Sequence, residues 1–173
     1  EPLPFKYQSD VGKDINYATP DGKTAHAWEV RSATPTKNYL FVVHEWWGLN
    51  DYIKQEAEKL GRDLGINVIA LDLYDNVVAS NREDAAKTMQ SVKSERAEAI
   101  IRGAYKYAGD DARVLDDDLA LKYVGDQPAA HDVAEHVVRG RDLRAVSKRL
   151  GAFVGEQNDD VGLAVAGVAV AQL

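Results

Sequence analysis

The sequence contains no cysteine, which excludes disulfide bonds, thiolate metal ligands and a cysteine nucleophile. It also has no apolar run long enough to cross a bilayer, since the longest, residues 161–173, is short and diluted by glycine and alanine. Positive charge is scarce: 28 acidic residues outnumber 21 lysines and arginines, so the net charge is −7. This balance disfavours non-specific binding to nucleic acid or to an anionic membrane.

An initiator methionine is also missing, because the sequence begins at Glu1. We therefore expect that a segment was removed, and this leaves both a cytoplasmic and an exported location open. What is present is typical of a soluble globular protein: 173 residues, of which 45% are hydrophobic and 28% are charged. This length predicts one domain, residues 1–173, with room for a sizeable core.

The most informative stretch is residues 39–50, which read YLFVVHEWWGLN. Its first five residues are a run of aromatic, β-branched and other apolar side chains, which predicts a buried strand. The run stops at a histidine, a glutamate and two tryptophans, and Asn50 can then cap a helix. In open α/β sheets, ligands bind at the carboxyl ends of the strands, so this loop is the first candidate site.

Hydrophobic spacing predicts the elements that come after this loop. We expect a helix over residues 51–64, ended by Gly65, and a buried strand over residues 67–73 that runs parallel to the first. Residues 81–107 predict two helices with a break near residues 91–94. Strands separated by helices in this way indicate the α/β class.

The two ends of the chain have weaker patterns. Residues 15–19 and 25–30 are expected to be strands joined by a turn at residues 20–23. Further elements are expected late in the chain: helices at residues 129–138 and 141–150, and a strand near residues 162–170.

The segment HEWWGLNDYIKQEAEKL, followed by VIALDLYD, resembles the dienelactone hydrolase family of α/β-hydrolases. That family has an hE-x-x-G-L loop after one strand and DLY after the next. The resemblance covers about residues 5–114, whereas residues 115–173 form an atypical tail. It implies a three-layer α/β-hydrolase-type fold with a mostly parallel sheet, which the tail either completes or leaves incomplete. The implied activity is hydrolysis of a small-molecule carboxylic ester or lactone, with no cofactor.

The resemblance also implies roles for individual residues. Glu45 matches the glutamate that hydrogen-bonds the resting nucleophile, and the backbone N–H of Trp46 matches one oxyanion-hole donor. Trp47 and Trp46 can line an aromatic pocket. Arg82 matches the arginine that holds a substrate carboxylate. Tyr74 belongs to the DLY signature and is a second candidate for substrate binding, or, like Asp72, it sets the end of the strand. Each of these residues also has a structural interpretation, such as core packing for the tryptophans.

Physical chemistry supports Glu45 without the resemblance. A carboxylate at the mouth of an apolar strand should be partly desolvated, which raises its pKa and suits it to proton transfer. For Arg82, by contrast, the expected tyrosine four residues later is replaced by Ala86. This departure argues against a dienelactone as the substrate.

The nucleophile elbow of the family, Gly-x-Ser/Cys-x-Gly, does not occur in the sequence. The nearest spacing in the tail, Gly151 to Gly155, has Phe153 at its centre, and phenylalanine cannot attack an ester. His131 and His136 follow Asp116 in the order of a triad, but no nucleophile precedes them. These histidines are five residues apart rather than four, so no metal site is expected.

Three interpretations therefore remain open. The chain is an ester or lactone hydrolase whose nucleophile the sequence does not reveal, a non-catalytic small-molecule-binding homologue, or a truncated fragment. A fragment with an exposed sheet edge would favour oligomers.

Overall fold

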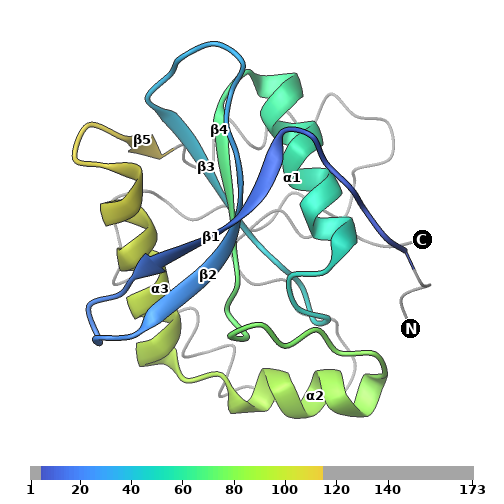
Figure 1. Cartoon of the computed structure of the whole chain (residues 1–173). Helices are drawn as coiled ribbons and strands as arrows, with labels where there is room; N and C mark the ends of the chain where they lie inside the picture. The colour runs from blue at the N-terminus through green and yellow to red at the C-terminus, as the bar shows by residue number, and fades with distance from the viewer. Residues whose placement is uncertain (1–4, 115–173) are drawn as a thin grey trace.

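The computed structural model of the chain describes residues 5–114 (Figure 1). These residues form a five-stranded sheet and three helices. The strands are β1 (Gly12–Ala18), β2 (Thr24–Val30), β3 (Asn38–Val43), β4 (Asn67–Leu71) and β5 (Arg113–Val114). The helices are α1 (Asp51–Leu64), α2 (Arg82–Ser91) and α3 (Ser94–Ala108).

The strand order is β1-β2-β4-β3-β5. The β1–β2 and β2–β4 pairings are antiparallel, whereas β3–β4 and β3–β5 are parallel, so the sheet is mixed over the described residues. The parallel register places Val43 opposite Leu71. The loops that follow β3 and β4 therefore leave the sheet at the same edge.

Helices cover both faces of the sheet, which gives three layers (Figure 1). On one face, Ile53, Ala57 and Leu60 of α1 pack against side chains of the central strands, including Val42 and Val68. On the opposite face, residues of α3 pack against the other set of strand side chains: Ala97, Ile100, Ile101 and Ala104 against Ile15, Tyr17, Ile69 and Leu71. Alternate strand residues thus supply two separate cores.

Local sequence explains where α1 begins and ends. The Asn50 side chain accepts a hydrogen bond from the Ile53 N–H, which satisfies one of the free amides of the first turn. Gly65 adopts a left-handed conformation and closes the last turn by donating its N–H to Gly61. Both features agree with the boundaries expected from the sequence.

The other expected elements within residues 5–114 are also present, including the interruption between α2 and α3. Two boundaries differ by more than one residue: β1 begins at Gly12, three residues earlier than expected, and β4 ends at Leu71, two residues earlier than expected. The Asp72 carboxylate accepts hydrogen bonds from the Tyr74 and Asn76 N–H groups, which bends the chain away from the strand. The elements expected in the tail lie outside the described residues.

Candidate active site

The loop after β3, residues 44–50, is a tight and largely buried turn. The Gly48 N–H donates to the Glu45 carbonyl at 3.2 Å, and the Asn50 N–H donates to the Gly48 carbonyl at 2.8 Å. Gly48 has φ +90°, and a Cβ atom there would lie 2.3 Å from the Val77 carbonyl oxygen. The loop therefore requires glycine at this position for both its backbone conformation and its close approach to residue 77.

The loop after β4, residues 72–81, lies against the first. Its Ala79 N–H donates to the Trp47 carbonyl at 2.9 Å. Asp75 and Asn76 both adopt left-handed conformations, with φ values of 49° and 73°. Aspartate and asparagine tolerate this region better than most residues, so the sequence suits the turn.

His44 holds the two loops together. Its Nδ1–H donates to the Glu45 carbonyl at 2.8 Å, and its Nε2 accepts a hydrogen bond from the Leu73 N–H at 3.1 Å. Burial lowers the pKa of the imidazole, although the nearby Asp72 carboxylate, 3.9 Å away, acts in the opposite direction. The ring is thus neutral, and its two hydrogen bonds fix the tautomer.

Glu45 is half-buried at the start of the first loop, and desolvation raises the pKa of its carboxyl group. Within residues 5–114, its carboxylate has no hydrogen-bond or ion-pair partner. The Trp46 N–H likewise has no acceptor among these residues. A carboxylate with a raised pKa therefore lies next to a backbone donor that has no acceptor within residues 5–114.

The two tryptophans differ in burial. Trp47 is 9% exposed and packs in a small core with Ala79 and Ala85, and Trp46 is half-buried against this core. Their rings are tilted, with centroids 5.4 Å apart. Trp47 therefore has a packing role, which was one of the two interpretations of its sequence.

Tyr74 contacts His44 edge-on, with ring centroids 4.4 Å apart. Burial raises the pKa of its hydroxyl to about 12, so it is protonated at neutral pH. Arg82, in contrast, is exposed as the first residue of α2 and has no ion pair with any described residue. Tyr74 lies against the buried histidine, whereas Arg82 contributes no contact that links it to Glu45.

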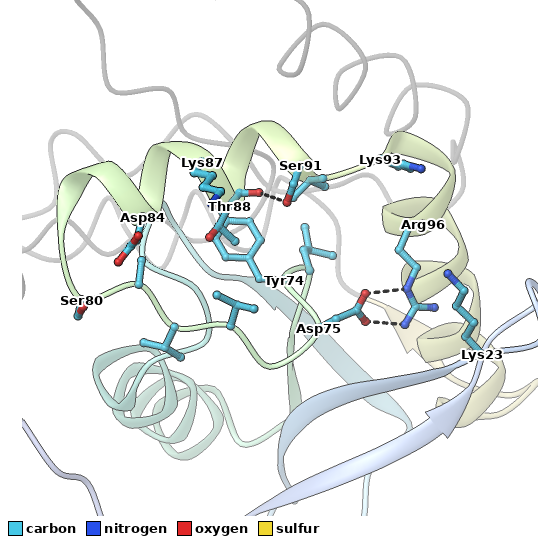
Figure 2. A pocket seen from close by; sticks show the side chains of 15 residues that line it. Lys23, Tyr74, Asp75, Ser80, Asp84, Lys87, Thr88, Ser91, Lys93 and Arg96 are labelled. Carbon is cyan, nitrogen blue, oxygen red and sulfur yellow. Dashed lines mark hydrogen bonds and ion pairs between the residues drawn. The ribbon is translucent and has the colours of Figure 1, made fainter.

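A cavity of about 540 Å³ opens beside the second loop (Figure 2). Of the five residues predicted for the site, only Tyr74 lines it. The other lining residues come from the second loop, α2, the start of α3 and the β1–β2 turn: Lys23, Leu73, Asp75, Val77, Val78, Ala79, Ser80, Asp84, Lys87, Thr88, Ser91, Val92, Lys93 and Arg96. The sequence thus did not reveal this cavity, because its lining comes from four separate segments.

The sequence also did not reveal the positioning roles of His44 and Arg96. The Arg96 guanidinium donates to Asp75, Thr19, Asp21 and the Thr24 carbonyl, and thereby joins the second loop to the β1–β2 turn. For His44, the available signal was its place directly after a buried strand. Nothing in the sequence pairs Arg96 with residues more than 70 positions earlier.

Neither a metal centre nor a membrane span is found in the described part of the chain. Residues 5–114 contain no group of three or more metal-ligating side chains. None of their helices is long and apolar enough to cross a bilayer. The histidines and aspartates of the tail, including His131, His136 and Asp116, lie outside these residues.

Comparison with protein families decides the classification. The model of the dienelactone hydrolase family matches residues 26–125, more than half of the chain. The chain belongs to the dienelactone hydrolase family. The match starts later and ends later than the resemblance seen in the sequence, and it contains the Glu45 loop. A comparison with curated proteins gave no match.

Several solved structures are similar to part of this chain. A protein called m3DLH shares 22% identity over 60% of this chain and 46% of its own, with a TM-score of 0.49. A protein assigned as a dienelactone hydrolase, from Klebsiella pneumoniae subsp. pneumoniae MGH 78578, shares 19% identity over 61% of this chain and 48% of its own, with a TM-score of 0.49.

A third structure is a dienelactone hydrolase-like promiscuous phosphotriesterase from metagenomic libraries. It shares 20% identity over 60% of this chain and 47% of its own, with a TM-score of 0.45. The chain thus spans about half the length of the solved structures that it matches.

Proposed function

We propose that this member of the dienelactone hydrolase family acts on a carboxylic ester or lactone, with the loop of residues 44–50 as one half of the reaction site. The observation that carries the proposal is the half-buried Glu45 carboxylate beside the Trp46 N–H, both without partners among the described residues. In this role Glu45 holds and helps to deprotonate a nucleophile.

The Trp46 N–H would serve as one donor to the oxyanion that develops when an ester or lactone carbonyl is attacked. Such donors are effective when they are fixed before the reaction, because no energy is then needed to reorient them. The turn hydrogen bonds of Gly48 and Asn50, and the bond between Ala79 and Trp47, hold this amide in place.

Arg82 and Tyr74 are assigned different parts in this proposal. The exposed guanidinium of Arg82 is available for the carboxylate of an acidic substrate, because no described residue pairs with it. Tyr74 supports the site by packing against His44. The small-molecule substrate itself is an ester or lactone of unspecified structure.

A second candidate function is ligand binding without turnover. It is favoured by one observation: none of the 173 residues forms a Gly-x-Ser/Cys-x-Gly elbow. Under this alternative, the Trp46 and Glu45 groups bind an ester or lactone but do not cleave it.

The test is hydrolysis of p-nitrophenyl acetate by the purified chain, by Glu45→Gln and by Glu56→Gln. Glu56 is a matched control because it is also half-buried, lies on α1 and has no partner among the described residues. We expect turnover above the buffer rate that falls about 100-fold in Glu45→Gln, in the range of lost general-base catalysis, and is unchanged in Glu56→Gln.

Equal turnover in all three proteins would show that Glu45 has no role in the reaction. Turnover at the buffer rate in all three would overturn the hydrolase proposal for this chain. In that case, binding of γ-butyrolactone, measured by calorimetry, should still be weakened in Glu45→Gln if the binding alternative holds.

A further inference from the structure

The cavity beside the second loop carries an excess of positive charge. Four cationic side chains line it, Lys23, Lys87, Lys93 and Arg96, against two carboxylates (Figure 2). This excess is unusual in a chain whose net charge is −7. Charge of one sign that gathers in a concave site focuses the electric field and attracts ions of the opposite sign.

Both carboxylates of the cavity already have partners. Asp75 accepts two hydrogen bonds from Arg96, at 2.6 and 3.2 Å. Asp84 accepts one from the Asn81 amide at 2.7 Å. The carboxylate oxygens are thus held by neighbouring donors, and the Asp75 charge is compensated by a guanidinium.

The three lysines are different, because none has an acidic partner within residues 5–114. Lys87 lies on α2, Lys93 at the N-terminal cap of α3 and Lys23 in the β1–β2 turn, so they come from separate segments around one cavity (Figure 2). Arg96 cannot serve a ligand in the same way, since Asp75, Asp21 and Thr24 already occupy its donors. The lysine ammonium groups are therefore the ones available to an anion.

The remaining lining includes apolar side chains. Val77 and Val78 are 45% and 51% exposed, which makes them two of the three large hydrophobic side chains that are exposed in residues 5–114. They line the cavity together with Leu73, Ala79 and Val92. Exposed valines beside unpaired lysines form a surface with an apolar part and a cationic part.

We propose that this cavity binds an organic anion with a short apolar body, the anionic group toward the lysines and the apolar body against Val77 and Val78. The proposal does not depend on hydrolysis, because neither Glu45 nor Trp46 lines the cavity. It predicts a second binding site in the family member, which borders the candidate reaction site at Tyr74 but contains neither Glu45 nor Trp46.

Calorimetry with three probes tests the two halves of the proposal. Octanoate has both an anionic group and an apolar body, acetate has only the anionic group, and 1-octanol has only the apolar body. At low ionic strength we expect octanoate to bind the full chain about tenfold or more tightly than either of the others, since the two contributions add. Its affinity should fall as sodium chloride is added.

Variants locate the site. Changing Lys87 and Lys93 together to glutamine should weaken octanoate binding about fivefold, as expected for loss of two partly exposed charge interactions. The matched control changes Lys6 and Lys59 to glutamine, because both are exposed, unpaired among the described residues and outside the cavity. Changing Val77 and Val78 together to serine tests the apolar half of the proposal. The six side chains changed in these three double variants are all on the surface, where substitution disturbs folding little.

Each negative result would overturn one defined part of the proposal. If 1-octanol binds as tightly as octanoate, the anionic half is wrong, and if acetate binds as tightly, the apolar half is wrong. If the Lys87 and Lys93 variant binds octanoate no more weakly than the Lys6 and Lys59 variant, the site is not in this cavity. Because Glu45→Gln leaves the cavity intact, octanoate binding in that variant separates this proposal from the hydrolase proposal.

Discussion

The loops after β3 and β4 leave the sheet side by side, yet they are built in different ways. The first, residues 44–50, is a compact turn held mainly by its own backbone and by buried His44. The second, residues 72–81, depends on side chains: Asp72 shapes its start and Arg96 anchors it from α3. The first loop therefore holds the Glu45 carboxylate and the Trp46 N–H on a fixed backbone, as suits a reaction site. The second loop borders an open cavity whose unpaired lysines come from other segments, as suits a binding site.

Gly48→Ala should have the largest effect and break the first loop. The substitution places Cβ 2.3 Å from the Val77 carbonyl oxygen and adds a side chain at φ +90°. We expect a loss of about 3 kcal/mol in the free energy of unfolding, because strain and steric overlap act together. Urea denaturation followed by circular dichroism measures the change.

The control is Gly22→Ala, in the β1–β2 turn. Gly22 also has a left-handed backbone, φ +77°, but no atom would lie within 4 Å of a Cβ atom added there. The expected loss is about 1 kcal/mol from backbone strain alone. Equal losses in the two variants would show that the contact with residue 77 does not constrain the first loop.

Arg96→Met should break the second loop. Its side chain is 11% exposed, and its removal leaves Asp75 and Asp21 without their cationic partner. The expected cost is about 2 kcal/mol, the range for lost hydrogen bonds to charged groups. Faster hydrogen exchange at Val77 and Ala79 should accompany it, since their amides close the second loop.

Arg102→Met on the same helix is the comparison for Arg96. Its pair with Glu98 is exposed and four residues apart, so about 0.4 kcal/mol should be lost. If both arginine variants lose the same small amount, Arg96 does not anchor the second loop.

Glu45→Gln should have the smallest effect and the opposite sign. Because burial raises the pKa of Glu45 above its usual 4.5, the folded state disfavours the ionised carboxylate at neutral pH. Glutamine removes that penalty and should stabilise the fold by about 0.4 kcal/mol at pH 7.5, a value kept small because the group is partly solvated.

The pH dependence gives the sign of this effect independently. In the wild type the penalty is present above the folded pKa and disappears as the pH falls below 4.5, so the difference between the two proteins should vanish there. Urea unfolding at pH 4 and pH 7.5, with Glu56→Gln as the reference, measures it. A destabilised Glu45→Gln at pH 7.5 would mean that the carboxylate has a structural partner.

Local pattern was enough to predict most elements within residues 5–114. The stripe of Ile53, Ala57 and Leu60 identified α1, and glycine and asparagine marked its ends. Alternation was less informative in β2, where Glu29 is 1% exposed. The Glu29 carboxylate lies 2.6 Å from the Arg31 guanidinium and 3.4 Å from the Lys13 ammonium group. Lys13 lies on the neighbouring strand β1, so the spacing of residues within β2 cannot predict that this charge is paired.

For the site, the sequence predicted the desolvation of Glu45, and the raised pKa confirms it. The catalytic role of Glu45 stays a prediction, since activity depends on a nucleophile that the sequence pattern does not identify. The oxyanion or pocket roles of Trp46 and Trp47, and the substrate-binding roles of Arg82 and Tyr74, stay predictions as well. The cavity was not predicted, because it forms only when α2, α3 and a distant hairpin come together. Long-range juxtapositions of this kind are set by tertiary packing and not by spacing.

The position of β4 between β2 and β3 has a consequence for synthesis on the ribosome. The β1–β2 hairpin can form as soon as it emerges, but neither β2 nor β3 can complete its pairing until residue 71 is available. At about 5–20 residues per second, the nascent chain exposes two strand edges for seconds. Chaperone capture or premature association should therefore be concentrated in that interval. The arrival of β4 pairs these two edges, and the other edge of β3 then waits for β5 at residues 113–114.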